Sequence, residues 1–195
     1  MWRRLLPWCA AMVAFEGIAL AAKPPPSPSY ASAAVESGVY PVSVTFSETG
    51  EGAVAIKAEC AIPRPAESVW RVISDYDHLA EFVPSLTESR IVRREGAIQI
   101  LHQRGRARFL FFRRAFSVTF RVEETPPREI RFEAFEGDFK QFKGSWRLEA
   151  HPEGTLVRHE VVLEPAFFVP RWILRAMERH ILLTSMRAII RRCME

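Results

Sequence analysis

From residue 42 to residue 163 the chain repeatedly alternates apolar with polar residues. The clearest run is 116–123, in which Phe, Val, Phe and Val alternate with Ser, Thr, Arg and Glu. Successive side chains of a strand point to opposite faces, so each run predicts a strand with one buried and one solvated face. About seven such strands, most of them separated by short turns, predict an antiparallel sheet with one face open to water.

Two helical patterns accompany these strands. Residues 69–86 contain two short apolar helical pieces separated by Asp75-Tyr76-Asp77, and residues 171–193 repeat apolar residues at helical spacing. Pro170 precedes the long pattern and suits the start of a helix. A sheet with one apolar face needs a second layer, which the terminal helix can supply, so the pattern predicts a single α+β domain.

The N-terminus has the features of a secretory signal peptide in residues 1–22: Arg3-Arg4, an apolar run, and Ala19-Leu20-Ala21 as a cleavage site. We therefore expect this segment to be removed and the protein to be exported to the periplasm. Glu16 inside the apolar run opposes membrane insertion, and an uncleaved N-terminal membrane anchor is the alternative.

Residues 23–39 are rich in Pro, Ser and Ala and are expected to form an extended linker, so that the folded domain spans residues 40–195. Cleavage would leave Cys60 and Cys193 in an oxidising compartment, where a disulfide could persist. We interpret them as two separate buried thiols, because a disulfide requires their Cα atoms to approach within about 7 Å.

The charge of the chain is mildly basic. Its net charge is +4; removing residues 1–22 lowers Lys plus Arg from 27 to 25 and Asp plus Glu from 23 to 22, which leaves +3. Such an excess permits peripheral contact with an anionic membrane, whereas nucleic-acid binders concentrate a much larger surplus. We expect no nucleic-acid partner, and the sequence leaves the oligomeric state open.

Catalytic motifs are missing from the sequence. It contains no nucleophile elbow, zinc-protease motif, phosphate-binding loop or C-x-x-C pair, and its five histidines lack metal-ligand spacing. We therefore expect no metal and no cofactor, and we assign no catalytic residue.

The order of the elements and several short segments carry a family resemblance. The segments are Val69–Tyr76, Phe82–Leu86, Gly137–Trp146 and Phe167–Pro170. Together they resemble the polyketide cyclase/dehydrase and coenzyme Q-binding branch of the START-like (SRPBCC) superfamily, over residues 40–193. The resemblance implies a helix-grip fold, in which a curved antiparallel sheet wraps the long C-terminal helix and leaves a cavity for an apolar ligand.

The function implied by this resemblance is binding, with carriage or sequestration, of a hydrophobic small molecule or lipid. An isoprenoid quinone is one such ligand, and no chemistry is expected. Two alternatives remain open. One is a polyketide cyclase or dehydratase that uses the same cavity, since catalysis by a shaped pocket leaves almost no motif. The other is a protein or ribosome interaction module.

The expected ligand-binding residues come from two sources. The resemblance places the Phe82-Val83-Pro84 corner near the cavity mouth, while strand and helix facing nominates inward side chains. His159 is either a satisfied core group or a hydrogen-bonding partner for a carbonyl or hydroxyl of the ligand, and Gln103 has the same two interpretations. The full set is Leu79, Phe82, Val83, Gln103, Phe116, Phe120, Trp146, His159, Met177 and Ile181. Packing within the core is the alternative role for the first three.

A second surface is suggested by an apolar run between arginines near an expected strand-to-strand bend. Its members are Arg108, Phe109, Leu110, Phe111, Phe112 and Arg113. Such a segment could enter a bilayer while its guanidinium groups contact lipid phosphates. In the alternative interpretation, Phe109 and Phe111 line the interior of a strand and the arginines form a solvated rim.

Overall fold

The computed structural model describes residues 33–35, 41–48, 53–109 and 112–195. The predicted signal peptide, most of the predicted linker, Leu110 and Phe111 lie outside these residues. Within the described ranges, none of the helices combines the length and the apolar character that crossing a membrane requires.

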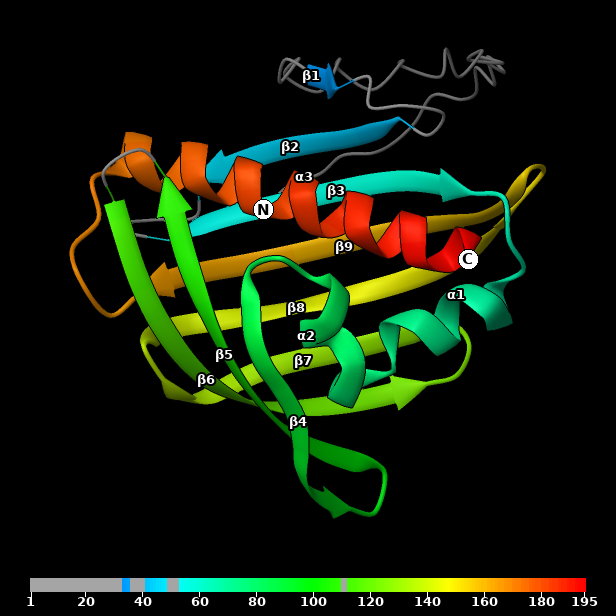
Figure 1. The fold of residues 1–195 in the computed structure, drawn as a ribbon, viewed down its shortest axis with the longest axis horizontal. Coiled ribbons are helices and arrows are strands. Elements are labelled where there is room, and N and C mark those ends of the chain that lie inside the picture. Colours follow the sequence, from blue (N-terminus) through cyan, green and yellow to red (C-terminus); the bar gives the residue numbers. More distant parts are fainter. Residues whose placement is uncertain (1–32, 36–40, 49–52, 110–111) are drawn as a thin grey trace, which may run out of the picture.

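The core of the fold is a nine-stranded antiparallel sheet with the order β1-β2-β3-β9-β8-β7-β6-β5-β4. Its strands are β1 Ala33–Val35, β2 Val42–Glu48, β3 Val54–Ile62, β4 Leu86–Glu95, β5 Ile98–Phe109, β6 Phe112–Thr125, β7 Glu129–Gly137, β8 Phe139–His151 and β9 Gly154–Pro165. Figure 1 shows the sheet curving around the C-terminal helix. The predicted helix-grip fold, a curved antiparallel sheet with a long terminal helix, is confirmed.

Side-chain burial follows the alternation of the sequence. Along β9, half-buried and fully buried residues alternate from Gly154 to Pro165 without interruption. The buried positions, Val157, His159, Val161 and Leu163 among them, face the helix layer, and the others face outward. The period-2 pattern thus decides which side chains reach the interior.

The predicted two-piece helix consists of α1 Ala66–Ile73 and α2 Leu79–Phe82, separated by the single 3₁₀ turn η1 Tyr76–His78. Two side chains account for the interruption. Tyr76 is buried against the core, and the Asp77 carboxylate accepts a hydrogen bond from the Ile91 amide at 2.8 Å. The break therefore ties this segment to strand β4.

The C-terminal helix α3, Arg171–Met194, lies across the concave face of the sheet, with α1 and α2 beside its C-terminal half (Figure 1). Its last turn is held by Arg64, whose Nε donates to the Cys193 carbonyl at 3.0 Å and whose Nη2 donates to the Met194 carbonyl at 3.1 Å. The Arg64 carbonyl in turn accepts a hydrogen bond from Thr155 Oγ1 at 2.7 Å. A cation thus satisfies carbonyls that a helix end leaves without intrahelical partners.

Strand β1 pairs with β2 and lies inside the segment that was expected to be a linker. With only three residues, Ala-Ala-Val, this strand is too short to show alternation in the sequence.

Cys60 and Cys193 are both free and buried, in agreement with the interpretation as separate thiols. Burial raises the pKa of Cys60 to about 12 and that of Cys193 to about 11, so both remain protonated.

Candidate functional site

A cavity of about 230 Å³ lies between the concave face of the sheet and helix α3. The sheet supplies its floor from strands β3 and β5–β9, α3 supplies Ile181, Leu182, Ser185 and Ile189, and the α1–α2 segment supplies Tyr76 and Leu79. Most of the side chains that line it are apolar, so the site favours a guest with little polar surface.

One wall of the cavity is a set of interlocked phenylalanine rings. Phe120 lies 5.4 Å from Phe132 and 5.0 Å from Phe142 between ring centroids, with both pairs edge to face. Phe139 continues the set, 4.8 Å from Phe142 and 5.8 Å from Phe116. Edge-to-face aromatic pairs stabilise packing by about 0.5–1.5 kcal/mol beyond their buried area, so these contacts help to hold the apolar wall together.

A row of directly opposed residues crosses the sheet below the cavity. Glu124 on β6 faces Ile130 on β7, which faces Trp146 on β8, which faces His159 on β9. Opposed residues of an antiparallel pair share one face, so all four project toward the interior. The row carries a polar group at each end and apolar groups between them.

At the β6 end of this row, Tyr76 donates its hydroxyl hydrogen to Glu124 Oε1 at 2.6 Å. Burial, followed by the hydrogen bond and the charge of Glu124, raises the pKa of Tyr76 well above its ordinary value. Tyr76 therefore stays protonated, and this hydrogen bond closes one side of the cavity floor.

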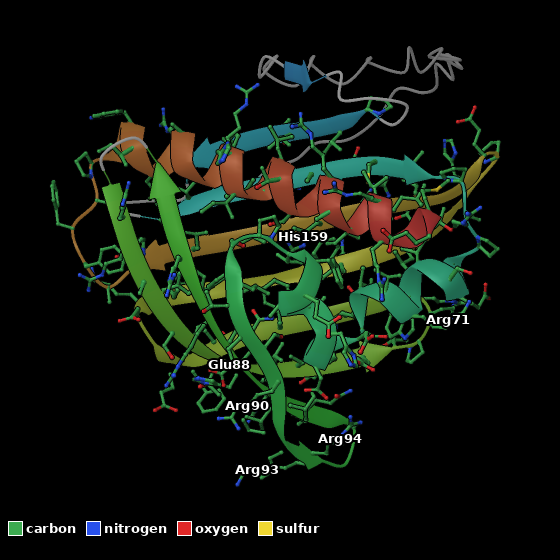
Figure 2. The ribbon with its side chains drawn as sticks, in the orientation of Figure 1. Arg71, Glu88, Arg90, Arg93, Arg94 and His159 are labelled. Atoms are coloured by element: carbon green, nitrogen blue, oxygen red, sulfur yellow. The ribbon has the colours of Figure 1, made fainter. Side chains whose placement is uncertain are left out.

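At the β9 end, His159 is buried in the middle of the molecule, far from the arginines of β4 (Figure 2). Its Nδ1 lies 3.1 Å from the Ser145 carbonyl oxygen, and its ring stacks on Trp146 with centroids 3.7 Å apart. Burial lowers the pKa of His159 to about 4, so the imidazole is neutral at physiological pH.

The remaining polar lining is sparse. Gln103 donates from Nε2 to Ser89 Oγ at 3.1 Å, and Ser85 and Ser185 also border the cavity. Arg114 lies on the lining with its guanidinium carbon 4.5 Å from the centre of the Phe167 ring. This cation–π contact joins β6 to the segment that precedes α3. Arg114 is also exposed to solvent.

Most of the residues expected to bind a ligand lie on the cavity wall: Leu79, Val83, Gln103, Phe116, Phe120, Trp146, His159 and Ile181. Phe82 does not line it; its ring packs partly buried on the core, 5.9 Å from the Arg192 guanidinium carbon. The side chain of Met177 lies outside the described residues. The ligand-binding role of every one of these residues stays a prediction.

Sequence reasoning missed several members of the lining. Phe132 and Phe142 stand at inward positions of their strands, so the alternation itself could have nominated them. Tyr76 carried no signal beyond its place between two acidic residues. Arg114 was not among the residues selected from the sequence, and only the fold shows that it borders the cavity.

The expected membrane segment is described only in part. Arg113 is exposed on β6, whereas Leu110 and Phe111, and the side chains of Arg108, Phe109 and Phe112, lie outside the described residues. Two large apolar side chains that sequence reasoning did not select are exposed nearby: Phe168, 88% exposed, and Trp172, 58% exposed. They flank the start of α3, close in sequence to Phe167.

Comparison with known proteins gives one family match. Residues 62–190 match the model of the family described as polyketide cyclase / dehydrase and lipid transport. No curated protein matches the chain.

Solved structures with the same fold include proteins of several activities. A STAR-related lipid transfer protein from Xanthomonas axonopodis superposes with a TM-score of 0.64 at 18% identity, covering 83% of this chain and 97% of the other. The Zhui aromatase/cyclase from Streptomyces sp. R1128 gives 0.63 at 15% identity, covering 72% and 93%. A START superfamily protein from Mycobacterium smegmatis gives 0.60 at 16% identity, covering 72% and 96%. At these identities the comparisons establish the fold.

Proposed function

The chain belongs to the polyketide cyclase / dehydrase and lipid transport family, and from this premise we propose that it binds a small hydrophobic molecule or lipid in its internal cavity and carries or sequesters it without chemistry. The observation that carries the proposal is the cavity itself, which lies between the sheet and α3 and is lined mainly by apolar side chains. Burying apolar surface contributes about 25 cal/mol per Å², so such a site binds by shape and apolar contact.

The size of the cavity limits the guest. Its volume of about 230 Å³ is below the range of about 300–1,000 Å³ that is typical of ligand sites. A single hydrocarbon chain or a small fused ring system suits this space better than a lipid with two acyl chains. The finer proposal of an isoprenoid quinone rests on the family resemblance alone.

A cyclase or dehydratase activity is the competing function of the same site. Catalysis of that kind needs a group able to exchange protons, and His159 is the buried titratable group on the cavity wall nearest to that role. Its pKa of about 4 makes it a weak base. In the described part of the chain its only hydrogen-bond partner is a backbone carbonyl, so no observation favours this alternative.

Docking on an anionic membrane is a further part of the proposal. Phe168 and Trp172 expose large apolar side chains beside Phe167, which borders the cavity, and Arg113 and Arg114 add positive charge at the same end. Apolar side chains next to cations suit the interface between lipid headgroups and acyl chains. This surface extends the sequence-predicted segment of residues 108–113 onto the start of α3.

Export to the periplasm is proposed from the signal-peptide pattern of residues 1–22 alone. The N-terminal sequence of the protein purified from its own host tests it: export predicts a chain that begins after residue 21, and a chain intact from residue 1 in the cytoplasm would favour the interaction-module alternative.

The cavity hypothesis is tested with a pair of substitutions on neighbouring residues of β9. Val161 lines the cavity, whereas Val162 faces the outside of the sheet. Wild-type protein and Val162→Phe should bind the apolar fluorophore 2-methoxynaphthalene, and Val161→Phe should lose binding because its ring occupies the site. Equal binding by both variants, or no binding by the wild type, would refute the proposed function. Mass spectrometry of an organic extract of the protein from its host would then identify the natural ligand.

A further inference from the structure

The two nitrogens of the His159 ring have different surroundings. Nδ1 lies 3.1 Å from the Ser145 carbonyl oxygen. A carbonyl oxygen can only accept a hydrogen bond, so the hydrogen of the neutral ring must be on Nδ1. Nε2 is then left with a lone pair and no hydrogen, which makes it an acceptor.

This acceptor is open to the cavity. Within the described ranges no group donates a hydrogen bond to His159 Nε2. Among the polar side-chain atoms of the same ranges, only Arg187 Nε is both fully enclosed and without a partner. His159 Nε2 therefore has some accessible surface. His159 itself is buried and lines the cavity, so the accessible surface of Nε2 is cavity surface.

The apolar surroundings of Nε2 increase the free energy that a hydrogen-bond donor on the ligand would contribute to binding. Trp146 covers one face of the ring, and Phe132 lies 6.1 Å away between ring centroids. A ligand that fills the cavity displaces any water from Nε2. An apolar ligand cannot replace the hydrogen bond that such a water would donate. Leaving a buried acceptor without a donor costs free energy that a ligand hydroxyl would recover.

We propose that His159 Nε2 selects, among apolar molecules of suitable size, those that carry a hydroxyl group able to donate a hydrogen bond inside the cavity. This inference rests on the proposed function and narrows the ligand from any hydrophobic molecule to an alcohol or phenol. Carbonyl and ether oxygens bring only lone pairs toward Nε2 and are disfavoured. Of the two redox forms of a quinone, the reduced form, which has hydroxyls, would be preferred.

The test uses naphthalenes of nearly the same size. In wild-type protein, 2-naphthol should bind about tenfold more tightly than 2-methoxynaphthalene, as expected for one hydrogen bond made in a buried site. The ketone 2-acetonaphthone should bind no better than the ether. Equal affinities for the phenol and the ether would overturn the inference while leaving the cavity function intact. If none of the three bound, the proposed function itself would fail.

A matched pair of histidine substitutions locates the effect. His159→Leu should abolish the preference for 2-naphthol while 2-methoxynaphthalene still binds. His102→Leu, on the opposite face of β5 from Leu101 and Gln103, should keep the preference. A preference that survives in His159→Leu would place the hydroxyl elsewhere and refute the role of Nε2.

A spectroscopic measurement on the wild type covers the case in which His159→Leu does not fold. The ¹⁵N resonance of His159 Nε2 should have the chemical shift of an unprotonated ring nitrogen and move upfield when 2-naphthol, but not 2-methoxynaphthalene, is added. A protonated Nε2 in the free protein, or the same shift change with both compounds, would contradict the inference.

Discussion

The ring of His159 stacks on the ring of Trp146, with centroids 3.7 Å apart and an angle of 19° between the planes. The two residues are directly opposed on β9 and β8, so the sheet itself brings them together. Trp146 covers one face of the imidazole, and the Ser145 carbonyl fixes the ring edge through Nδ1. The buried histidine is therefore held on one face and at one edge, and Nε2 has no hydrogen-bond partner among the described residues.

Replacing Trp146 should test this stack. Trp146→Ala is expected to lower the free energy of unfolding by about 2–4 kcal/mol, because the half-buried indole leaves a gap against His159 and the cavity floor. Trp146→Phe should lose about 1 kcal/mol, since a ring remains. Urea unfolding measures both. Trp172→Ala is the control, at an exposed position where a change within about 0.5 kcal/mol is expected.

The stability of the protein should depend on pH through His159. Its pKa is about 4 in the folded protein and 6.5 when unperturbed, so between these values the unfolded chain binds the extra proton. The stabilisation is complete above pH 6.5 and is lost as the pH falls toward 4, by about 3 kcal/mol in all. Urea unfolding from pH 7.5 to pH 4 gives the slope.

Carboxyl groups titrate in the same range, and the variant His159→Leu separates their contribution. It should be less dependent on pH than the wild type by the amount assigned to His159. Parallel curves for the two proteins would show that His159 titrates normally in the folded state, against the burial described above.

Arg64 should stabilise the end of α3. Arg64→Ala removes the hydrogen bonds to the Cys193 and Met194 carbonyls and is expected to cost about 1–2 kcal/mol. Hydrogen exchange of the amides in the last turn should become faster. Arg71 (Figure 2) is a suitable control, because its guanidinium is exposed and contacts Ser68 on the same helix. Equal effects of Arg64→Ala and Arg71→Ala would contradict the anchoring role.

Membrane docking predicts a measurable dependence on two exposed residues. Phe168→Ala and Trp172→Ala should each weaken sedimentation with phosphatidylcholine–phosphatidylglycerol vesicles by about tenfold, because each side chain loses its burial among acyl chains. Added salt should weaken binding by the wild type. Val92→Ala, an exposed apolar position on β4 between Arg90 and Arg93, should bind like the wild type. No difference among the three variants would exclude this surface.

The fold could be predicted because the apolar residues of its strands and of its long helix recur at the spacing typical of each structure. Residues 116–123 alternate without exception and lie within β6, and the apolar repeat from Arg171 coincides with α3. Strand β4, from Leu86 to Glu95, shows no such regular alternation of apolar and polar residues. It is the edge of the sheet, and much of it is exposed, so its sequence has little need to alternate.

The site was less predictable because its details depend on local irregularities. Phe139 and Phe142 both line the cavity although they are three residues apart, a spacing that places side chains on opposite faces of a regular strand. A register shift between Phe139 and Gln141 reverses the facing, and the sequence does not mark it. The tautomer of His159 likewise depends on a carbonyl of the adjacent strand, 14 positions away.

The place of β9 in the sheet has a consequence for synthesis of the chain. It pairs Val54 with Leu163 and so joins strands made early to the one made last. Until β9 is made, β2–β3 and β4–β8 cannot join into one sheet, and the apolar face that α3 later covers has no partner layer. Pairing between strands so far apart in the sequence forms slowly. The nascent chain would therefore depend on other molecules to cover this apolar face until β9 and α3 are made.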